Sequence, residues 1–272
     1  MYRYLSIFNA ERVVVASPKG LSEVLVTKNY EFQKPRQARS VIGRVLGNGV
    51  LLAEGEEHRH QRKGLMPAFS FRQVKELFPI FWSKSCEVVD AISAEIQRKK
   101  GQGPSARAVE CNVPADVKVE SDEAIFEIHE WAGRATLDII GLTGMGRDFH
   151  AITDPNNELS QIYRTIFAPS RDAQLLQLFT VFLPQWAAIR LPIKRNYEIQ
   201  HALVVIRNLA RDLIRSKKES MERGEKSDGH DILSTAIESE IFSEENLIDQ
   251  VMTFLAAGHE SMFCLVLFLR LK

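Results

Sequence analysis

The chain has 272 residues, 45% of them hydrophobic and 26% charged, which are the proportions of an ordinary globular protein. Its 35 basic and 35 acidic residues give a formal net charge of zero, so nothing in the composition favours nucleic acid as a partner. Three scattered cysteines (Cys86, Cys111 and Cys264) exclude a disulfide framework, and the longest apolar run, 262–269, is too short for a transmembrane segment.

The first part of the chain, residues 1–35, predicts a small sheet followed by a short helix. Residues 2–8 and 11–16 are rich in β-branched and aromatic side chains, which indicates two strands joined by a turn. Ser17 then precedes Pro18, the pattern of a helix with a serine N-cap and a proline at its first position.

A helix is predicted over residues 55–69, and it carries two polar side chains of chemical interest. His58 and Arg62 are four residues apart and therefore share a helix face. The helix becomes apolar towards its end, which indicates that this end packs into the core. A ring N–H beside a guanidinium suits a carboxylate ligand. The alternative interpretation of the same residues is a solvated basic patch.

The middle of the chain, 72–230, predicts a helical core. We expect helices at residues 72–98, 125–142, 156–168 and 194–223, with a short one at 231–238 before the next segment. Residues 99–121 predict a loop, and Gly141 and Gly144 are expected to end the second helix. The core-packing residues of that helix are Trp131, Leu137 and Ile140. The apolar segment 175–186 suits a roof over an apolar ligand and equally well an ordinary packed connection.

The last segment, 243–271, predicts a long buried helix. Ser243 can cap it, and two glutamates follow where the helix dipole favours acids. Inside it, residues 256–261 turn first small and then polar, which destabilises a buried helix. That cost favours a functional interpretation, whereas an ordinary core helix with a tolerated glycine is the alternative.

The faces of this helix follow from its period of about 3.6 residues per turn. Phe254, Ala257, Gly258 and Ser261 fall within one sector, whereas Glu260 points well away from it. Small residues and one hydroxyl therefore share a face, where a flat or bulky group can approach the backbone.

Both segments resemble signatures of one enzyme family. The sequence Ala257-Gly-His-Glu-Ser261 is similar to the Ala-Gly-x-acid-Thr signature in the distal helix of cytochrome P-450 haem-thiolate monooxygenases, with serine in place of threonine. The spacing Gly55-x-x-His58-x-x-x-Arg62 resembles the helix whose Trp and Arg bind a haem propionate in that family, with His58 keeping a ring N–H. The opening sheet and the helix at 125–142 are also similar. On these segments the chain is identified as a member.

The resemblance implies the fold: mainly α with a small β-sheet, as a single partial cytochrome P-450 domain over residues 1–272. Its expected parts are the N-terminal sheet (1–35), the propionate-binding helix (55–69), the helical core and lid (72–230) and the distal helix (243–271).

The resemblance also implies an activity, insertion of one oxygen atom from O2 into an apolar organic substrate, with haem as cofactor. The implied roles are haem-propionate binding by His58 and Arg62, room for O2 at Ala257 and Gly258, proton relay by Glu260 and Ser261, and substrate contact by Phe254. The implied partners are an NADPH-dependent reductase and an apolar small molecule, and full-length eukaryotic members are expected at the endoplasmic reticulum membrane.

One feature of the family is missing from this sequence. The cysteine that ligates the haem iron lies in a Phe-x-x-Gly-x-x-x-Cys loop, and no cysteine here has that context. The axial cysteine is therefore expected beyond Lys272, and no metal-ligating residue is assigned. We expect a C-terminally truncated chain without the N-terminal membrane anchor, inactive on its own. The alternative is a non-catalytic helical product that holds no haem.

Overall fold

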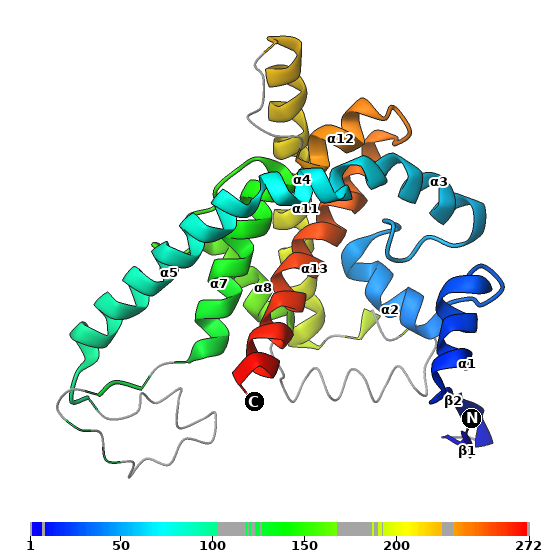
Figure 1. Cartoon of the computed structure of the whole chain (residues 1–272), viewed down its shortest axis with the longest axis horizontal. Helices are drawn as coiled ribbons and strands as arrows, with labels where there is room; N and C mark the ends of the chain where they lie inside the picture. Colours follow the sequence, from blue (N-terminus) through cyan, green and yellow to red (C-terminus); the bar gives the residue numbers. More distant parts are fainter. Residues whose placement is uncertain are drawn as a thin grey trace.

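The structure is a computed structural model that describes residues 2–6, 9–102, 118, 120, 123–125, 127–167, 187, 190–191, 193–224 and 231–270. Of residues 37, 129, 167 and 260–270 it describes the backbone alone. The predicted loop at 99–121 lies mostly, and the predicted roof at 175–186 wholly, outside these residues. The fold is mainly α with one small antiparallel sheet, as the sequence predicts (Figure 1).

The elements follow in chain order: β1 (Tyr2–Leu5), β2 (Glu11–Val14), α1 (Pro18–Ser22), η2 (Glu23–Thr27), α2 (Arg36–Leu46), α3 (Gly55–Leu65), η3 (Met66–Phe69), α4 (Phe71–Glu76), α5 (Phe78–Lys99), α7 (Ile128–Ile140), η4 (Gly141–Met145), α8 (Glu158–Phe167), α11 (Lys194–Glu222), α12 (Ile232–Glu238) and α13 (Glu244–Arg270). No described helix is both long enough and apolar enough to cross a membrane.

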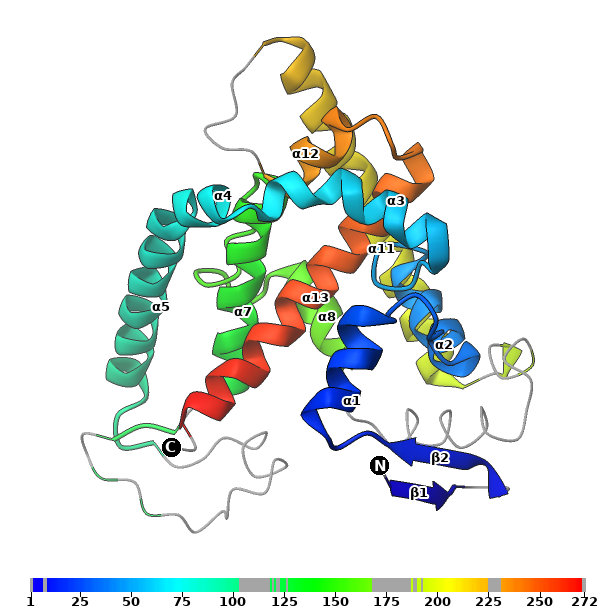
Figure 2. The same ribbon diagram turned by 45° about the vertical axis from the view of Figure 1, so that its right-hand side comes forward.

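The hairpin of β1 and β2 lies at the edge of the molecule, beside α1 (Figure 2). Tyr2 pairs with Val14 and Leu5 with Glu11, so both strands are shorter than predicted. The predicted cap of α1 is confirmed, because the Ser17 hydroxyl accepts a hydrogen bond from the Gly20 N–H at 3.2 Å. This satisfies one of the N–H groups that a helix start leaves unpaired.

Two helical segments differ from the sequence prediction. The helix expected at 72–98 is two helices, α4 and α5, which meet at Leu77, two residues before Pro79. Proline lacks an N–H and clashes inside a helix, so it is tolerated in a first turn but not in a helix interior. The α-helix α7 ends at Ile140 with Gly141 as its C-cap, as predicted, but the chain continues through Gly144 in the π-helical turn η4 and turns at Gly146 in a left-handed conformation (φ 69°). No element was predicted for α2.

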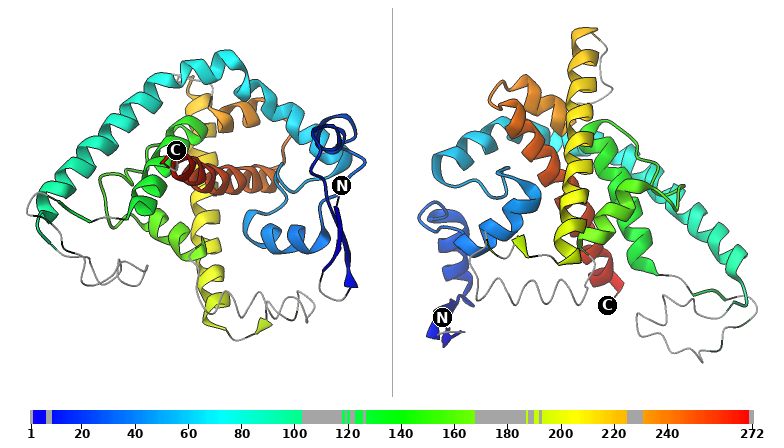
Figure 3. Two further views of the ribbon diagram at one scale, coloured as in Figure 1. Left: turned by 60° about the horizontal axis from the view of Figure 1, so that its bottom comes forward. Right: turned by 180° about the vertical axis from the view of Figure 1, so that it is seen from behind.

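The helix α13 lies at the centre of the helical body and contacts α7, α11 and α2 (Figures 1 and 3). Its residues Leu247, Ile248, Val251, Met252 and Leu255 are all buried, which confirms the predicted apolar face. The predicted Ser243 cap is also confirmed, since its hydroxyl accepts from the Asn246 N–H at 3.3 Å. The central position makes α13 a rigid, well-packed support for the residues that it carries.

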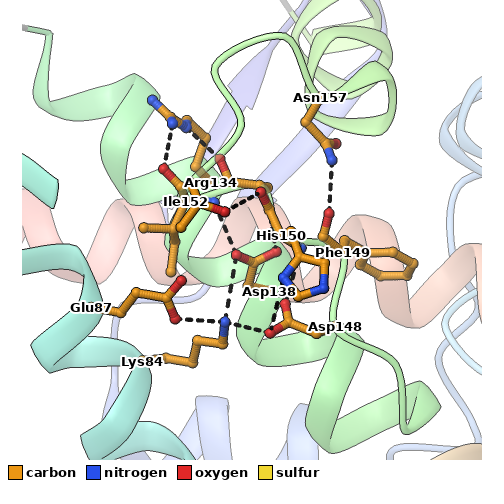
Figure 4. A network of polar contacts seen from close by, with 11 residues as sticks. Lys84, Glu87, Arg134, Asp138, Asp148, Phe149, His150, Ile152 and Asn157 are labelled. Carbon is orange, nitrogen blue, oxygen red and sulfur yellow. Dashed lines mark hydrogen bonds and ion pairs between the residues drawn. The ribbon is translucent and has the colours of Figure 1, made fainter.

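A buried network of charges joins α5 to α7 (Figure 4). The Asp138 carboxylate on α7, fully buried, accepts hydrogen bonds from the N–H groups of Ala151 and Ile152 at 2.7 and 2.9 Å. The Lys84 ammonium on α5 lies 2.6 Å from the Asp148 carboxylate and 3.9 Å from that of Asp138. Although burial lowers the pKa of Lys84, hydrogen bonds to Asp148 and Glu87 carry that pKa above its usual value. The network therefore keeps Lys84 charged inside the protein and holds α7 in place.

Candidate functional site

Two side-chain contacts bring α3 and α13 together. The Gln250 amide on α13 donates to the Gln61 amide oxygen on α3 at 2.9 Å, in a buried hydrogen bond. One turn further along α13, the Phe254 ring lies 5.8 Å between centroids from the ring of Phe69, which belongs to the 3-10 turn η3 directly after α3. Residues 250, 254, 257 and 261 follow each other at helical spacing on one side of α13. The structure thus places the His58–Arg62 helix beside the side of α13 that carries the predicted site.

The turn Gly47-Asn48-Gly49 fixes this arrangement from a third direction. The Asn48 N–H donates to the Asp249 carboxylate at 2.8 Å, and the Val50 N–H donates to the Gln250 side chain at 3.0 Å. A Cβ on Gly49 would lie 2.7 Å from the Asp249 carbonyl oxygen, so the turn needs glycine there to pack on α13. This role was not predicted from the sequence, although the Gly-x-Gly pattern is typical of such a tight turn.

His58 is half-buried on α3, and its Nδ1 atom lies 3.0 Å from the Tyr30 hydroxyl. Burial, followed by the positive charges of Lys34 and Arg62, lowers the pKa of His58, while the Glu54 carboxylate opposes that shift. The imidazole is therefore neutral near pH 7 and retains one ring N–H to donate.

The Arg62 side chain is exposed, and its guanidinium makes no hydrogen bond or ion pair with any residue that the structure describes. A guanidinium that keeps its donors open, one helical turn from a neutral imidazole, offers a charge-assisted site for a carboxylate. This donor set fits the propionate edge of a haem, which carries two carboxylates.

The small residues of α13 have a packing role that the sequence did not reveal. A Cβ on Gly258 would lie 2.6 Å from the Ile140 Cγ1 atom of α7, so the glycine permits a close helix crossing. At the same crossing, the Thr136 hydroxyl bonds to the His259 carbonyl oxygen at 3.1 Å. Phe254 and Ala257 are half-buried. The prediction that Ala257 and Gly258 leave room for a ligand stays a prediction, since packing alone explains the glycine.

The side chains of Glu260 and Ser261 lie outside the described part of the chain, so their predicted proton relay also stays a prediction. His259, which was not predicted as a core residue, is buried and stacks on the Tyr163 ring at 5.2 Å. The sequence indicates this burial, because His259 follows Leu255 by four residues and therefore lies on the same face of the helix.

The described residues contain no cysteine suited to an axial haem ligand. Cys86 is exposed on α5, and the side chains of Cys111 and Cys264 are not among those described. Within the same residues no group of three or more His, Cys, Asp or Glu side chains could hold a metal ion. What the described part offers is the His58–Arg62 donor pair on α3 and an adjacent face of α13.

Comparison with known proteins supplies the context for this geometry. A sequence profile of the family described as Cytochrome P450 matches residues 4–264. The chain is 42% identical over 266 residues to cytochrome P450 monooxygenase ALT8 of Alternaria alternata, covering 96% of this chain and 44% of that protein. It is 43% identical to the monooxygenases FUM15 of Gibberella moniliformis and sphH of Aspergillus fumigatus, over 95% of this chain and 41% and 45% of theirs. The chain thus spans less than half the length of these relatives.

Proposed function

Because this chain belongs to the cytochrome P-450 family, we propose that it forms the propionate-binding and oxygen-side part of a haem-dependent monooxygenase. The proposed reaction inserts one oxygen atom from O2 into an apolar organic substrate. Two contacts support this proposal above all: the Gln61–Gln250 hydrogen bond and the Phe69–Phe254 ring contact hold α3, which bears His58 and Arg62, beside α13. The whole of residues 1–272 is proposed to act as one domain.

Each predicted residue has a defined task in this proposal. The His58 ring N–H and the Arg62 guanidinium bind a haem propionate and so orient the cofactor. Phe254, whose ring contacts Phe69, supplies an apolar wall for the substrate, and Ala257 keeps a large side chain away from the space proposed for O2. Gly258 contributes to that space by letting α13 cross close to Ile140 of α7. When bound, haem supplies the reductive activation of O2.

Proton delivery is assigned to the second half of α13. Glu260 takes a proton from solvent on its carboxyl, and the Ser261 hydroxyl passes a proton on towards O2. Compared with the threonine usual in the family, serine has more rotamer freedom, which weakens the control over this transfer. An NADPH-dependent reductase is the proposed electron source, and the endoplasmic reticulum membrane the proposed location.

A spectroscopic titration tests the proposal. The 272-residue chain is titrated with haemin, reduced with dithionite and exposed to carbon monoxide. We expect a Soret band that saturates at one haem per chain, without the red shift of a thiolate-ligated carbon monoxide complex, because the sequence contains no Phe-x-x-Gly-x-x-x-Cys loop. A monodisperse helical protein that binds no haemin would support the haem-free alternative. A thiolate-type band would refute the inference that these residues lack the axial ligand.

A further inference from the structure

The turn that follows η2 touches the start of α3 through one aromatic residue. Tyr30 lies in this turn, which Figures 1 and 2 show next to α3, and its hydroxyl lies 3.0 Å from the Nδ1 atom of His58. The two rings are tilted by 54°, with centroids 5.6 Å apart. The Arg59 guanidinium covers the Tyr30 ring at 4.6 Å from its centroid. Tyr30 is therefore fixed both through its hydroxyl and by a cation on its ring face.

The direction of this hydrogen bond decides which ring nitrogen of His58 carries the proton. A neutral imidazole has one N–H donor and one acceptor nitrogen, and the partner of one nitrogen sets the state of the other. The charged groups around the ring are Arg62 and Arg59 on α3 itself and Lys34 and Glu54 on the segments packed against it. The cations and burial together favour the neutral ring, which carries a single proton on one of its two nitrogens. When the Tyr30 hydroxyl donates to Nδ1, Nδ1 is the acceptor and the proton lies on Nε2.

The two tautomers differ in what they offer a carboxylate. With the proton on Nε2, this nitrogen is a donor that can act together with the Arg62 guanidinium on one anion. With the proton on Nδ1, Nε2 presents a lone pair that repels a carboxylate. The tryptophan that the resembled family uses at this position has a single N–H and no tautomers. A histidine at the same position needs a second group that fixes its proton.

We propose that Tyr30 is a positioning residue that holds His58 as its Nε2–H tautomer, so that His58 and Arg62 form a matched pair of donors for one propionate carboxylate. This inference rests on the proposed haem binding, and it adds to that proposal the residue that makes histidine an effective replacement for tryptophan. Tyr30 itself does not contact the cofactor.

The first test needs no haem. In the 15N-histidine-labelled chain at pH 8, the two ring nitrogens of His58 are assigned by long-range 1H–15N correlation in the wild type and in Tyr30→Phe. We expect the wild-type shifts of one tautomer with a protonated Nε2 and a hydrogen-bonded Nδ1, and a shift of both resonances towards tautomer averaging in the variant. A protonated Nδ1 in the wild type, or identical shifts in the two proteins, overturns the proposal.

The second test connects the tautomer to ligand binding. We expect Tyr30→Phe to weaken haemin binding roughly three- to tenfold, the effect of one hydrogen bond. Tyr197→Phe is the matched control, because Tyr197 is exposed on α11 and its hydroxyl makes no hydrogen bond with any described residue. In a His58→Ala background, Tyr30→Phe is expected to have no further effect on binding.

The possible results separate the two proposals. Equal weakening by Tyr30→Phe in the wild-type and His58→Ala backgrounds would mean that Tyr30 only stabilises the fold, which overturns its positioning role. If no variant and no wild-type chain binds haemin, the proposed function fails, whereas the nitrogen shifts still decide whether Tyr30 sets the tautomer.

Discussion

Asp249 on α13 accepts a 2.8 Å hydrogen bond from the backbone N–H of Asn48, and its carboxylate fills the space where a side chain on Gly47 would lie. Gly47 is also left-handed, with φ at 70°. An alanine there costs about 1 kcal/mol for its backbone conformation and about 1–3 kcal/mol more for displacing the carboxylate. We therefore expect Gly47→Ala to lower the free energy of unfolding in urea by about 2–4 kcal/mol.

Gly224→Ala is the control for that prediction. Gly224 has nearly the same φ, 69°, but no atom of a described residue lies within 4 Å of its Cβ position, so this variant carries the backbone cost alone. Equal destabilisation by the two substitutions would show that the Asp249 contact does not constrain the turn.

A second prediction concerns the crossing of α7 and α13. An alanine at Gly258 would push into Ile140, and we expect Gly258→Ala to lower the free energy of unfolding by about 1–3 kcal/mol. Gly144→Ala also faces Ile140, but with its nearest atom at 3.2 Å, the flexible end of that side chain. The control should therefore change stability by less than about 1 kcal/mol. Thermal unfolding of both variants checks the difference, and a Gly258→Ala protein as stable as the wild type would contradict the close crossing.

The buried charge network gives a third prediction. Replacing Asp138 with alanine leaves two buried N–H groups without their acceptor and removes a negative charge near Lys84. We expect a loss of about 3–5 kcal/mol in the free energy of unfolding. Asp90→Ala on the exposed side of α5 should change stability by about 0.5 kcal/mol or less. Comparable losses in both variants would indicate that the network contributes little.

A fourth prediction is a titration. Hydrogen bonds from Arg98, and further from Lys99, lower the pKa of Glu95 to about 2 against the opposing effect of burial. Because the folded-state pKa lies below the ordinary value of 4.5, the ionised pair stabilises the protein above that pH. Its contribution disappears as the pH falls towards about 2. Carboxyl 13C shifts of Glu95 should show this titration, and Arg98→Ala should move it upwards. An unchanged midpoint in the variant would contradict the assigned cause.

The sequence predicts most of the helical architecture because periodicity and caps are local signals. Ser17 and Ser243 act as the N-caps that their positions indicate, and the buried face of α13 follows its apolar spacing. The α4–α5 break was missed because Pro79 lies inside a continuous amphipathic pattern, which hides the boundary.

The site is only partly predictable for a different reason. His58 and Arg62 are recognisable from their spacing, but their relation to α13 depends on Gln61–Gln250, a contact between residues 189 positions apart. The polar partners that fix such pairs, including Tyr30 for His58 and Asp249 for Asn48, have no local pattern. Gly258 belongs to the family signature. Glycine is also needed at this position because the Ile140 side chain on another helix occupies the space where a Cβ would lie.

The central claim is that the α3 face carrying His58 and Arg62 holds a haem propionate, and a haemin titration of two neighbouring cation variants tests it most directly. Arg62 and Lys63 are adjacent and both exposed, but they point in directions about 100° apart on α3. We predict that Arg62→Ala weakens haemin binding roughly tenfold, the loss of a charge-assisted hydrogen bond, while Lys63→Ala leaves the affinity unchanged. Equal haemin affinities for wild type, Arg62→Ala and Lys63→Ala would contradict the claim.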